Sequence, residues 1–556
     1  MKTKISIIML FFWHFAGIAF GQTNTVGLLF YDTTKAFAGY TLFTPLKSTK
    51  TYLINMNGML VHSWNSSYQP GQSVMLLSDG NLLRTAMVGA GNHFVQGGVG
   101  GRVELFDWNG NLIWYFEHFG NLYSTHHDIE YMPNGNILMI AWEKKTLAEV
   151  VAAGRDTAKA TYAEVWSEKI IEVQPDKVSG GGTIIWEWHI WDHLVQDFDS
   201  SKANYGIVSS RPGLFNINYG DKKVDWLHFN SIRYNSDRDE IMVSVHAIHE
   251  FWIIDHSTTT AQAAGHSGGN RGKGGDLLYR WGNPLAYKLG TATNQKLYSQ
   301  HDARWIDNGL QGAGNILIFN NGTKRPGRVY SSIEEIIPPL ATDGSYIREQ
   351  DSAYGPSVTA WSFVANPDTS FYAENISGAT RLQNGNSLIC EGPKGKFFEV
   401  DSSKQIVWTY MNPVAARIFS QGETPTDNMV FKIYRYAPTY SGLSGKVLTP
   451  VGPIELPSAI ENDVSSIGDF KLYQNYPNPF NPETSIRYDV PKTGNVLLKV
   501  FDTMGREVAT LVNDFQQQGT YTVSFNADKF SIPSGIYYYR ITIGGFSKCV
   551  KMICLK

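Results

Sequence analysis

Three histidines occupy the same position in a repeated strand-turn-strand pattern. Counting back eight residues from the turn glycines Gly135 and Gly309 reaches His127 and His301, and His228 holds the matching place in a looser copy of the pattern. We expect a strand to begin at each of these histidines. Two further copies of the pattern carry other polar residues at this position, Gln72 and Ser377.

The second strand of a hairpin ends at the sheet edge where the first strand began. The pattern therefore predicts Arg325 close to His301, and His246 and His249 close to His228. Neutral imidazole is a nucleophile and a proton carrier near neutral pH. Arginine presents a planar fork to oxyanions such as sulfate. A polar funnel of this composition suits the transfer of a negatively charged group.

Two other interpretations of these histidines stay open. A histidine in a strand is most often structural, and a repeat can keep a residue only because it packs well. Three imidazoles could also hold a metal ion, as in zinc enzymes, but they come from separate repeats and must converge on one point. The remaining histidines fall in turns or long loops, where we expect solvated side chains; they are His62, His93, His118, His189, His193, His256 and His266.

Other common catalytic motifs are missing from the sequence. It contains no phosphate-binding loop, no dinucleotide fingerprint and no serine nucleophile elbow. We therefore expect no cofactor and no bound metal. The formal net charge of −3 offers no general attraction to nucleic acid, so none is expected as a partner.

The histidines are positioned by a pattern that recurs six times. In each copy an apolar strand and a turn lead to a tryptophan, and the six are Trp64, Trp114, Trp186, Trp281, Trp361 and Trp408. A turn-and-strand motif alternates with this pattern, so each unit is a meander of about four short strands. Packing six such units radially hides their faces and closes a ring. The sequence thus predicts an all-β chain with a six-bladed β-propeller; a stack of sandwich domains is the alternative.

The propeller is predicted to span residues 22–436. Residues 437–467 are rich in Pro, Gly and Ser and are expected to form a linker. Residues 468–556 contain several strand-like runs with alternating apolar side chains, which indicates a small β-sandwich. Cys549 and Cys554 lie close together in this region and could pair, whereas Cys390 has no partner in the main domain.

The first 21 residues are typical of a signal peptide. Lys2 and Lys4 precede a mostly apolar run, and Ala19-Phe20-Gly21 is a small-x-small cleavage site. A membrane anchor is the alternative, although the apolar run is shorter than the roughly 20 residues that a span needs.

Residues from about 39 to 436 resemble the bacterial arylsulfate sulfotransferases, which are six-bladed propellers. The matching segments are residues 39–43, 225–230, 300–303, 317–322 with Arg325 and Pro326, and 381–392. The resemblance implies transfer of a sulfuryl group from a small phenolic sulfate ester to a phenol acceptor. It further implies that no nucleotide donor is needed and that transfer passes through a sulfated histidine.

Matched by motif, the resemblance implies catalytic roles for three residues. His228 binds and polarises the sulfuryl group or a phenolic oxygen, His301 does likewise or shuttles a proton, and Arg325 holds the sulfuryl oxygens. We expect substrate to be bound by His127, His246, His249 and Ser377. The nucleophilic histidine of the family stands near the segment that here reads 375–379, and this chain has no histidine after His301.

Residues 468–556 resemble the sorting domain of the type IX secretion system, through residues 473–482, 500–508 and 534–539. The resemblance implies contact with the secretion machinery, export through the periplasm, and a place outside the cell or on its outer surface. From the residues alone, a carbohydrate-binding or adhesion sandwich fits equally well.

Three functions follow as hypotheses. The first is an aryl sulfotransferase that acts on phenols. The second is a non-catalytic secreted propeller that binds a ligand or partner after losing the nucleophilic histidine. The third and weakest is a metal- or quinone-dependent propeller enzyme.

Overall fold

The computed structural model describes residues 24–457, 471–490, 493–543 and 546–556, so the predicted signal peptide lies outside the described residues. The chain divides into two compact units, Met1–Ala459 and Ile460–Lys556. In the part of the chain described, no helix combines the length and the apolar character needed to cross a bilayer.

Antiparallel sheets follow one another along the first unit, as the short apolar runs and tight turns predict. The first sheet contains β2 (Tyr40–Phe43), β3 (Lys50–Ile54) and β4 (Met59–Asn65), flanked by β27 (Tyr434–Tyr436) and β28 (Gly452–Pro453). The second contains β5 (Pro70–Leu76), β6 (Leu82–Met87), β7 (Gly101–Phe106) and β8 (Leu112–Glu117). The third contains β9 (Tyr123–Tyr131), β10 (Ile137–Thr146), β11 (Glu164–Pro175) and β12 (Gly182–His189).

Three more sheets complete the series. The fourth contains β15 (Phe229–Asn235), β16 (Glu240–Val245), β17 (Glu250–Asp255) and β18 (Tyr279–Trp281). The fifth contains β19 (His301–Trp305), β20 (Ile316–Asn320), β21 (Ser332–Ile336) and β22 (Trp361–Phe363). The sixth contains β23 (Gly378–Arg381), β24 (Ser387–Glu391), β25 (Lys396–Val400) and β26 (Ile406–Met411), joined by β1 (Gly27–Tyr31).

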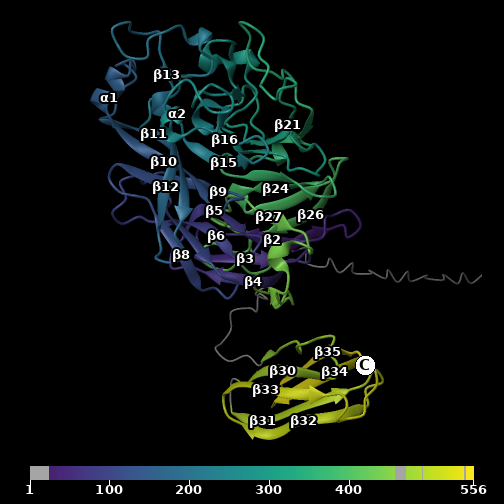
Figure 1. Ribbon diagram of the computed structural model, residues 1–556. Helices are drawn as coiled ribbons and strands as arrows, with labels where there is room; N and C mark the ends of the chain where they lie inside the picture. Colours follow the sequence, from purple (N-terminus) through teal and green to yellow (C-terminus); the bar gives the residue numbers. More distant parts are fainter. Residues whose placement is uncertain (1–23, 458–470, 491–492, 544–545) are drawn as a thin grey trace, which may run out of the picture. The chain divides into compact units, whose positions relative to one another are not determined.

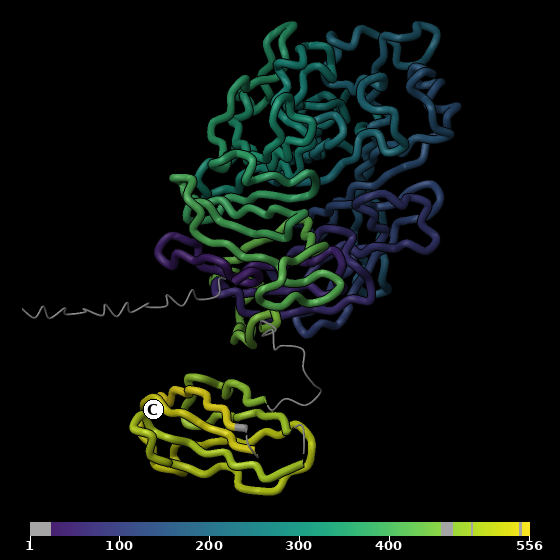
Figure 2. The backbone as a smooth tube through the Cα atoms, turned by 180° about the vertical axis from the view of Figure 1, so that it is seen from behind, coloured from purple at the N-terminus to yellow at the C-terminus, as the bar shows by residue number. Residues whose placement is uncertain are grey.

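The first strands of successive sheets pack against one another near the middle of the unit, where β5, β9 and β15 lie in Figure 1. The two ends of the unit complete its last and first sheets, because β1 pairs with β26 and β27 pairs with β2. Figure 2 shows the purple start of the chain beside green segments from residues near 400. The all-β prediction is confirmed. The number of blades stays a prediction, although the described residues of the first unit form as many four- or five-stranded sheets as six blades require.

Short elements interrupt the chain within the third and fourth sheets and between them. Helix α1 (Leu147–Ala152) joins β10 to β11, and α2 (Thr260–Ala263) follows β17. Both helices begin with a capping box, in which a threonine accepts a backbone N–H and the residue three positions later bonds back to it. The two-stranded parallel sheet of β13 (Leu194–Val195) and β14 (Phe215–Asn216) precedes β15.

A buried network of ion pairs joins the first strands of three sheets. The Arg233 guanidinium on β15 bonds Asp128 of β9 at 2.9 Å and Asp302 of β19 at 2.6 Å. Lys432, just before β27, reaches the other oxygen of Asp128 at 2.5 Å. All four side chains are at most 9% exposed. Buried charges are tolerated only when they are paired and hydrogen-bonded, so these residues fix how the three strands and the end of the unit meet.

The predicted linker begins later than the sequence indicated. Residues 437–457 belong to the first unit, because Leu443 and Ile454 are buried in its apolar clusters and β28 pairs with β4. These apolar side chains are few among many Pro, Gly and Ser residues, so composition alone concealed them. The rest of the predicted linker falls largely in residues 458–470, which lie outside the described residues.

The second unit consists of two antiparallel sheets with apolar side chains on alternate positions. One contains β29 (Lys471–Leu472), β30 (Glu483–Val490) and β33 (Gly519–Asn526). The other contains β31 (Gly494–Phe501), β32 (Glu507–Gln516), β34 (Gly535–Ile543) and β35 (Phe546–Cys554). Both sheets contribute to one buried apolar cluster, as the sandwich prediction requires.

The suggested pairing of Cys549 and Cys554 does not occur, and both thiols are free. The two residues lie on the same strand, β35, five positions apart. A strand rises about 3.4 Å per residue, which separates them by roughly 17 Å. An odd spacing also directs the two side chains to opposite faces of the sheet, where Cys549 is exposed and Cys554 is buried.

Replacing Lys432 with methionine tests the buried network, because it removes the ammonium group and keeps the length of the side chain. We expect the free energy of unfolding to fall by roughly 3–5 kcal/mol, the cost of breaking a buried pair. Every tryptophan lies before residue 409, so tryptophan fluorescence during urea unfolding reports the first unit alone.

The matched control is Arg417→Met, which removes an exposed pair with Glu423 and should cost at most about 1 kcal/mol. Equal losses in the two variants would show that the network does not hold the strands together.

Candidate functional site

The position eight residues before the turn glycine has an unusual backbone conformation. Gln72, His127, His228 and Ser377 all have a positive φ there, and in the fifth sheet Asp302 takes this role beside His301. The pairing register of β5, β9, β15 and β19 shifts at this point. A left-handed conformation costs a non-glycine residue about 1–3 kcal/mol, and such residues cluster at functional sites.

Four imidazoles form a row at this end of the first strands. The ring centroids of His127 and His228 are 4.5 Å apart, those of His228 and His246 are 5.3 Å apart, and those of His246 and His301 are 5.2 Å apart. Each ring meets the next at a steep angle, edge to face. The ring of Phe431 lies 6.0 Å from His127 and 6.5 Å from His301, so it packs against both ends of the row.

His228 is the member of the row whose surroundings favour the positively charged form. Burial by itself would lower its pKa, but the Asp225 carboxylate, 2.5 Å from Nδ1, raises the pKa of His228 above its usual value. In return, the pKa of Asp225 is lowered, although burial opposes this. The imidazolium therefore has Nδ1 bonded to Asp225 and Nε2 available to another group.

The neighbours of His228 are neutral. Burial lowers the pKa of His127 and of His246 well below the usual value, and the charge on His228 lowers both further. Burial also lowers the pKa of His301 to about 4. The Nδ2 group of Asn321 donates to two carbonyls, so its Oδ1 accepts from Nδ1–H of His301 at 2.8 Å. The Nε2 atom of His301 therefore carries the lone pair.

A buried relay that the sequence analysis missed ends at His127. Nδ1 of His127 is 2.8 Å from Nδ1 of His126, and Nε2 of His126 is 2.9 Å from Oε2 of Glu168. Burial raises the pKa of Glu168 well above its usual value and lowers the pKa of His126 well below. A protonated Glu168 donates to Nε2 of His126, whose Nδ1–H then donates to Nδ1 of His127, so all three groups are neutral. His126 adjoins His127 in sequence, but nothing local points to Glu168.

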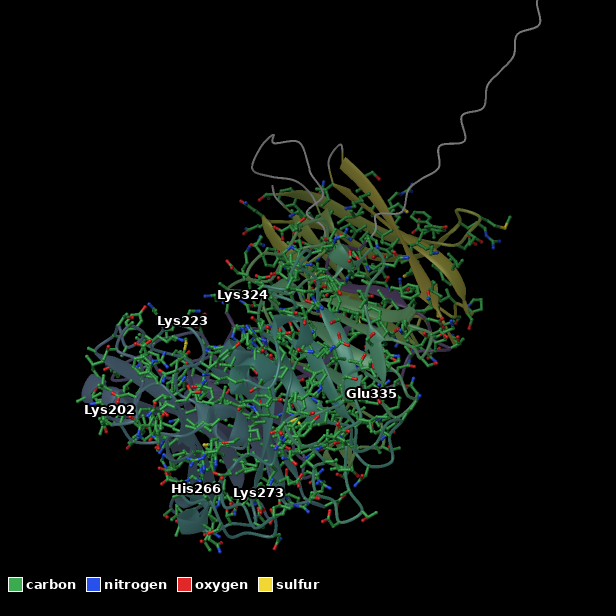
Figure 3. All side chains as sticks on the ribbon, turned by 90° about the horizontal axis from the view of Figure 1, so that it is seen from above. Lys202, Lys223, His266, Lys273, Lys324 and Glu335 are labelled. Carbon is green, nitrogen blue, oxygen red and sulfur yellow. The ribbon has the colours of Figure 1, made fainter. Side chains whose placement is uncertain are left out.

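A pocket of about 370 Å³ opens onto the middle of the row. His228 and His246 line it, together with Asp225, Lys223 and Tyr162. Lys223 and Lys324 lie on the same side of the first unit in Figure 3, and both pair with Asp221. Their ammonium groups give this side of the pocket a positive charge suited to an anion.

His127 is shielded from the pocket by the loop before β7. Its ring is 2% exposed, and a Cβ added to Gly98 would lie 1.9 Å from Cε1 of His127. The carbonyl of Gly98 also accepts the backbone N–H of His127 at 2.8 Å. Only a glycine can pack this closely on the ring, so its conformation and its missing side chain are both required.

Three of the predicted site residues are engaged elsewhere. The Arg325 guanidinium donates to Ser332 and lies over the rings of Tyr298 and Tyr330, so its contacts among the described residues run to these groups rather than to His301. Nδ1 of His249 accepts the backbone N–H of Ser299. Burial lowers the pKa of His249 to about 4.

Ser377 is fully buried at the start of the sixth sheet. Its hydroxyl accepts the N–H of Gly392 at 3.0 Å and donates to the carbonyl of Asn375 at 3.2 Å. Both hydrogen-bonding functions of the hydroxyl are therefore used to hold the turn, which opposes a role in contact with substrate.

A charged imidazole beside neutral ones can donate a proton while a neighbour attacks. Pairs of titratable groups whose surroundings push their pKa values apart are the usual arrangement for acid and base roles. Here burial lowers the pKa of His246, whereas the Asp225 carboxylate raises the pKa of His228.

A family model described as Arylsulfotransferase (ASST) matches residues 64–433. The chain belongs to the arylsulfotransferase family. A second model, described as a secretion system C-terminal sorting domain, matches residues 474–555. This is a sorting domain of the type IX system, and it indicates secretion or export to the cell surface. No curated protein matches the chain.

Several solved structures resemble the arylsulfotransferase chain at low identity. A protein of unknown function from Bacteroides caccae is 13% identical over 72% of this chain and 98% of its own, with a TM-score of 0.38. Virginiamycin B lyase from Staphylococcus aureus is 12% identical over 72% and 87%, with a TM-score of 0.31. A periplasmic gluconolactonase of Pseudomonas aeruginosa is 10% identical over 87% and 99%, with a TM-score of 0.34. At TM-scores below 0.5 these likenesses carry no argument about function.

Asp225→Asn should lower the pKa of His228 below its ordinary value, because burial then acts without the opposing carboxylate. NMR titration of histidine ring protons would measure this shift. Asp239→Asn is the control, since Asp239 bonds His256, whose pKa is also raised. That variant should lower the pKa of His256 and leave His228 unchanged. A His228 pKa unaffected by Asp225→Asn would contradict the assigned charge.

The lowered pKa of His301 makes the fold sensitive to acid. The unfolded side chain takes up a proton near pH 6.5, whereas the folded one resists until about pH 4. Stability is therefore lost as pH falls through this window, by roughly 3 kcal/mol from His301 alone. Urea unfolding between pH 7 and pH 4 should show a smaller decline for His301→Gln. An equal decline in the variant and the parent would show that His301 is not held neutral.

Proposed function

We propose that this arylsulfotransferase transfers a sulfuryl group from a small phenolic sulfate ester to a phenol acceptor, without a nucleotide donor. The observation that carries the proposal is the pairing of a charged His228 with a neutral His246 on the wall of one pocket. An acid and a nucleophile are the two groups that this transfer needs.

His246 is the proposed nucleophile. Attack on sulfur requires an unprotonated ring nitrogen that reaches the substrate, and His246 is both neutral and part of the pocket wall. His127 is also neutral but is covered by Gly98. Ser377, which stands near the place of the nucleophilic histidine in the related family, is buried with its hydroxyl engaged. His246, which directly follows β16 of the fourth sheet, thus takes the place of the nucleophilic histidine that the sixth sheet lacks.

Transfer proceeds in two balanced steps. A ring nitrogen of His246 forms a bond to sulfur while the bond from sulfur to the phenolic oxygen breaks. The leaving oxygen takes the Nε2 proton of His228, so phenol departs and His228 becomes neutral. In the second step the acceptor phenol returns a proton to His228, its oxygen bonds to sulfur, and the bond to His246 breaks. Both imidazoles end as they began.

The other polar residues support this exchange. Lys223 lines the pocket and attracts the anionic sulfuryl oxygens. His301 has a supporting role at the end of the row, where its ring lies next to that of His246. Arg325 is proposed to hold sulfuryl oxygens, which requires its guanidinium to leave Ser332 and the rings of Tyr298 and Tyr330. The Glu168 relay keeps His127 neutral, so that the positive charge of the row stays on His228.

Export is proposed to follow the route that the two ends of the chain imply. The signal peptide in residues 1–21 would carry the protein into the periplasm. The sorting domain in residues 468–556 would then engage the type IX machinery for passage across the outer membrane. Phenolic substrates outside the cell would then be accessible to the pocket.

A binding protein without catalysis is the second candidate. It is favoured by one observation, the absence of any histidine after His301, which leaves the sixth sheet without the nucleophile of the family. A bound aryl sulfate that is never cleaved would be its signature.

Variants of the two pocket histidines test the transfer with a chromogenic aryl sulfate and a phenol acceptor. His246→Asn should lower kcat at least about 1000-fold and His228→Asn by about 100- to 10,000-fold, because each removes one proposed reacting group. His62→Asn is the control, since His62 packs on Trp108 in another sheet, and it should retain the parental rate.

Two results would contradict the proposal. If the parent protein releases no phenol above background, the transferase function is wrong and the binding protein stands. If His246→Asn keeps the parental rate, the reaction uses another nucleophile.

A further inference from the structure

A second group of chemically reactive side chains lies outside the histidine row. The expectation that His193 is solvated was wrong: the side chain is 0% exposed, and its ring stacks on Trp188 at 5.6 Å. It stands immediately before β13, in the segment between the third and fourth sheets. A buried side chain adds nothing to solubility, so we expect His193 to have a structural or chemical role.

His193 meets two residues from the glycine-rich loop that follows α2. Oδ1 of Asp276 is 2.8 Å from Nδ1 of His193 and 2.8 Å from Nδ1 of His266. The three ligand atoms lie within 4.8 Å of one another. Within the residues described, no other group of three His, Cys, Asp or Glu side chains converges in this way.

The tautomer of His193 makes the contact with Asp276 anomalous. Nε2 of His193 is 2.7 Å from the carbonyl oxygen of Ala263. A carbonyl can only accept, so Nε2 must carry a proton. A neutral ring then has its lone pair on Nδ1, aimed at a carboxylate oxygen 2.8 Å away. Two lone pairs at this distance repel unless a proton or a cation lies between them.

We propose that Nδ1 of His193, Nδ1 of His266 and the Asp276 carboxylate bind a divalent transition metal of the zinc type. Two imidazoles and one carboxylate are a common zinc ligand set, with bonds of about 2.0–2.2 Å. Tetrahedral geometry then needs ligand atoms roughly 3.3 Å apart, about half an ångström more than now separates Asp276 from each ring. The side chains of Asp276 and His266 are 20% and 61% exposed, and they can shift to make this adjustment.

The surrounding contacts orient the His193 ring and the backbone that carries Asp276. A Cβ added to Gly275 would lie 2.0 Å from the carbonyl oxygen of Ala263 and 2.5 Å from Nε2 of His193. Nε1 of Trp188 donates to the carbonyl of Gly275 at 2.7 Å. The backbone next to Asp276 is thus packed on the buried imidazole, and the Ala263 carbonyl orients that ring, as partners outside the ligand set do in metal sites.

The proposed ion would have an open position. Three protein ligands leave one coordination site free, as in catalytic zinc centres. His266 and Asp276 line a pocket of about 700 Å³ that also contains Arg211, Lys273 and Arg348. These cations suit an anionic ligand on the metal. In Figure 3, His266 and Lys273 lie away from Lys223 and Lys324, so this site is separate from the sulfuryl-transfer pocket.

Isothermal titration of the dialysed, untagged protein with zinc chloride at pH 7.5 tests the proposal. Cys549 is exposed and is alkylated beforehand, so that its thiol does not compete. We expect one zinc per chain. Cobalt should give the visible absorption of a four-coordinate ion. Both signals should fall at pH 5.5, because binding must displace protons from the imidazoles.

His266→Ala supplies the decisive comparison, because an exposed ligand can be removed without disturbing the fold. Zinc affinity should drop at least tenfold in this variant and in Asp276→Asn. The control is His93→Ala, which removes another exposed histidine that bonds a carboxylate, Glu164, and it should bind zinc as the parent does. No binding by the parent, or equal binding by His266→Ala and the parent, would overturn the proposal and leave a protonated His193 paired with Asp276.

Discussion

The arrangement of the first unit depends on the pairing of a few buried charges where its first strands meet. Arg233 bridges Asp128 and Asp302, and Lys432 neutralises the remaining oxygen of Asp128. None of these groups can be left alone without a cost comparable to much of the stability of a domain. Asp128 directly follows His127, and Asp302 directly follows His301. Fixing the two carboxylates therefore also fixes where the two imidazoles stand.

Burial then decides which imidazoles carry charge. Removing a histidine from water favours its neutral form, and this dominates at His127, His246 and His301. At His228 the Asp225 carboxylate overcomes the same penalty. A row of chemically equal side chains is thus divided into one acid and several neutral bases. In the proposed transfer, access selects the reacting residues, since His228 and His246 face the pocket while Gly98 covers His127.

The repeat made part of this site predictable from sequence. Counting from the turn glycine located a backbone position whose left-handed conformation recurs at Gln72, His127, His228 and Ser377. Local spacing also placed His246 beside His228, because β15 and β16 are joined by a short turn. The placement of Arg325 beside His301 stays a prediction; its guanidinium lies over the rings of Tyr298 and Tyr330.

Other residues of the site could not be predicted from the sequence around them. Glu168 lies 42 residues from His126, and only the pairing of β10 with β11 brings it to the relay. Asp225 precedes His228 by three residues, but nothing in that spacing says that its charge outweighs burial. The fold class followed from turn and strand periodicity, whereas the packing of residues 437–457 depended on a few apolar side chains hidden in a polar segment.

The proposed transfer requires that a neutral His246 accept the sulfuryl group beside a protonated His228. It is tested most directly by mass spectrometry of peptides after the protein meets an aryl sulfate briefly and is quenched in base. We expect a sulfuryl adduct that fragmentation places on His246, and its loss when a phenol acceptor is added before quenching. An adduct on His127 or His301, or phenol release without any histidine adduct, would contradict it.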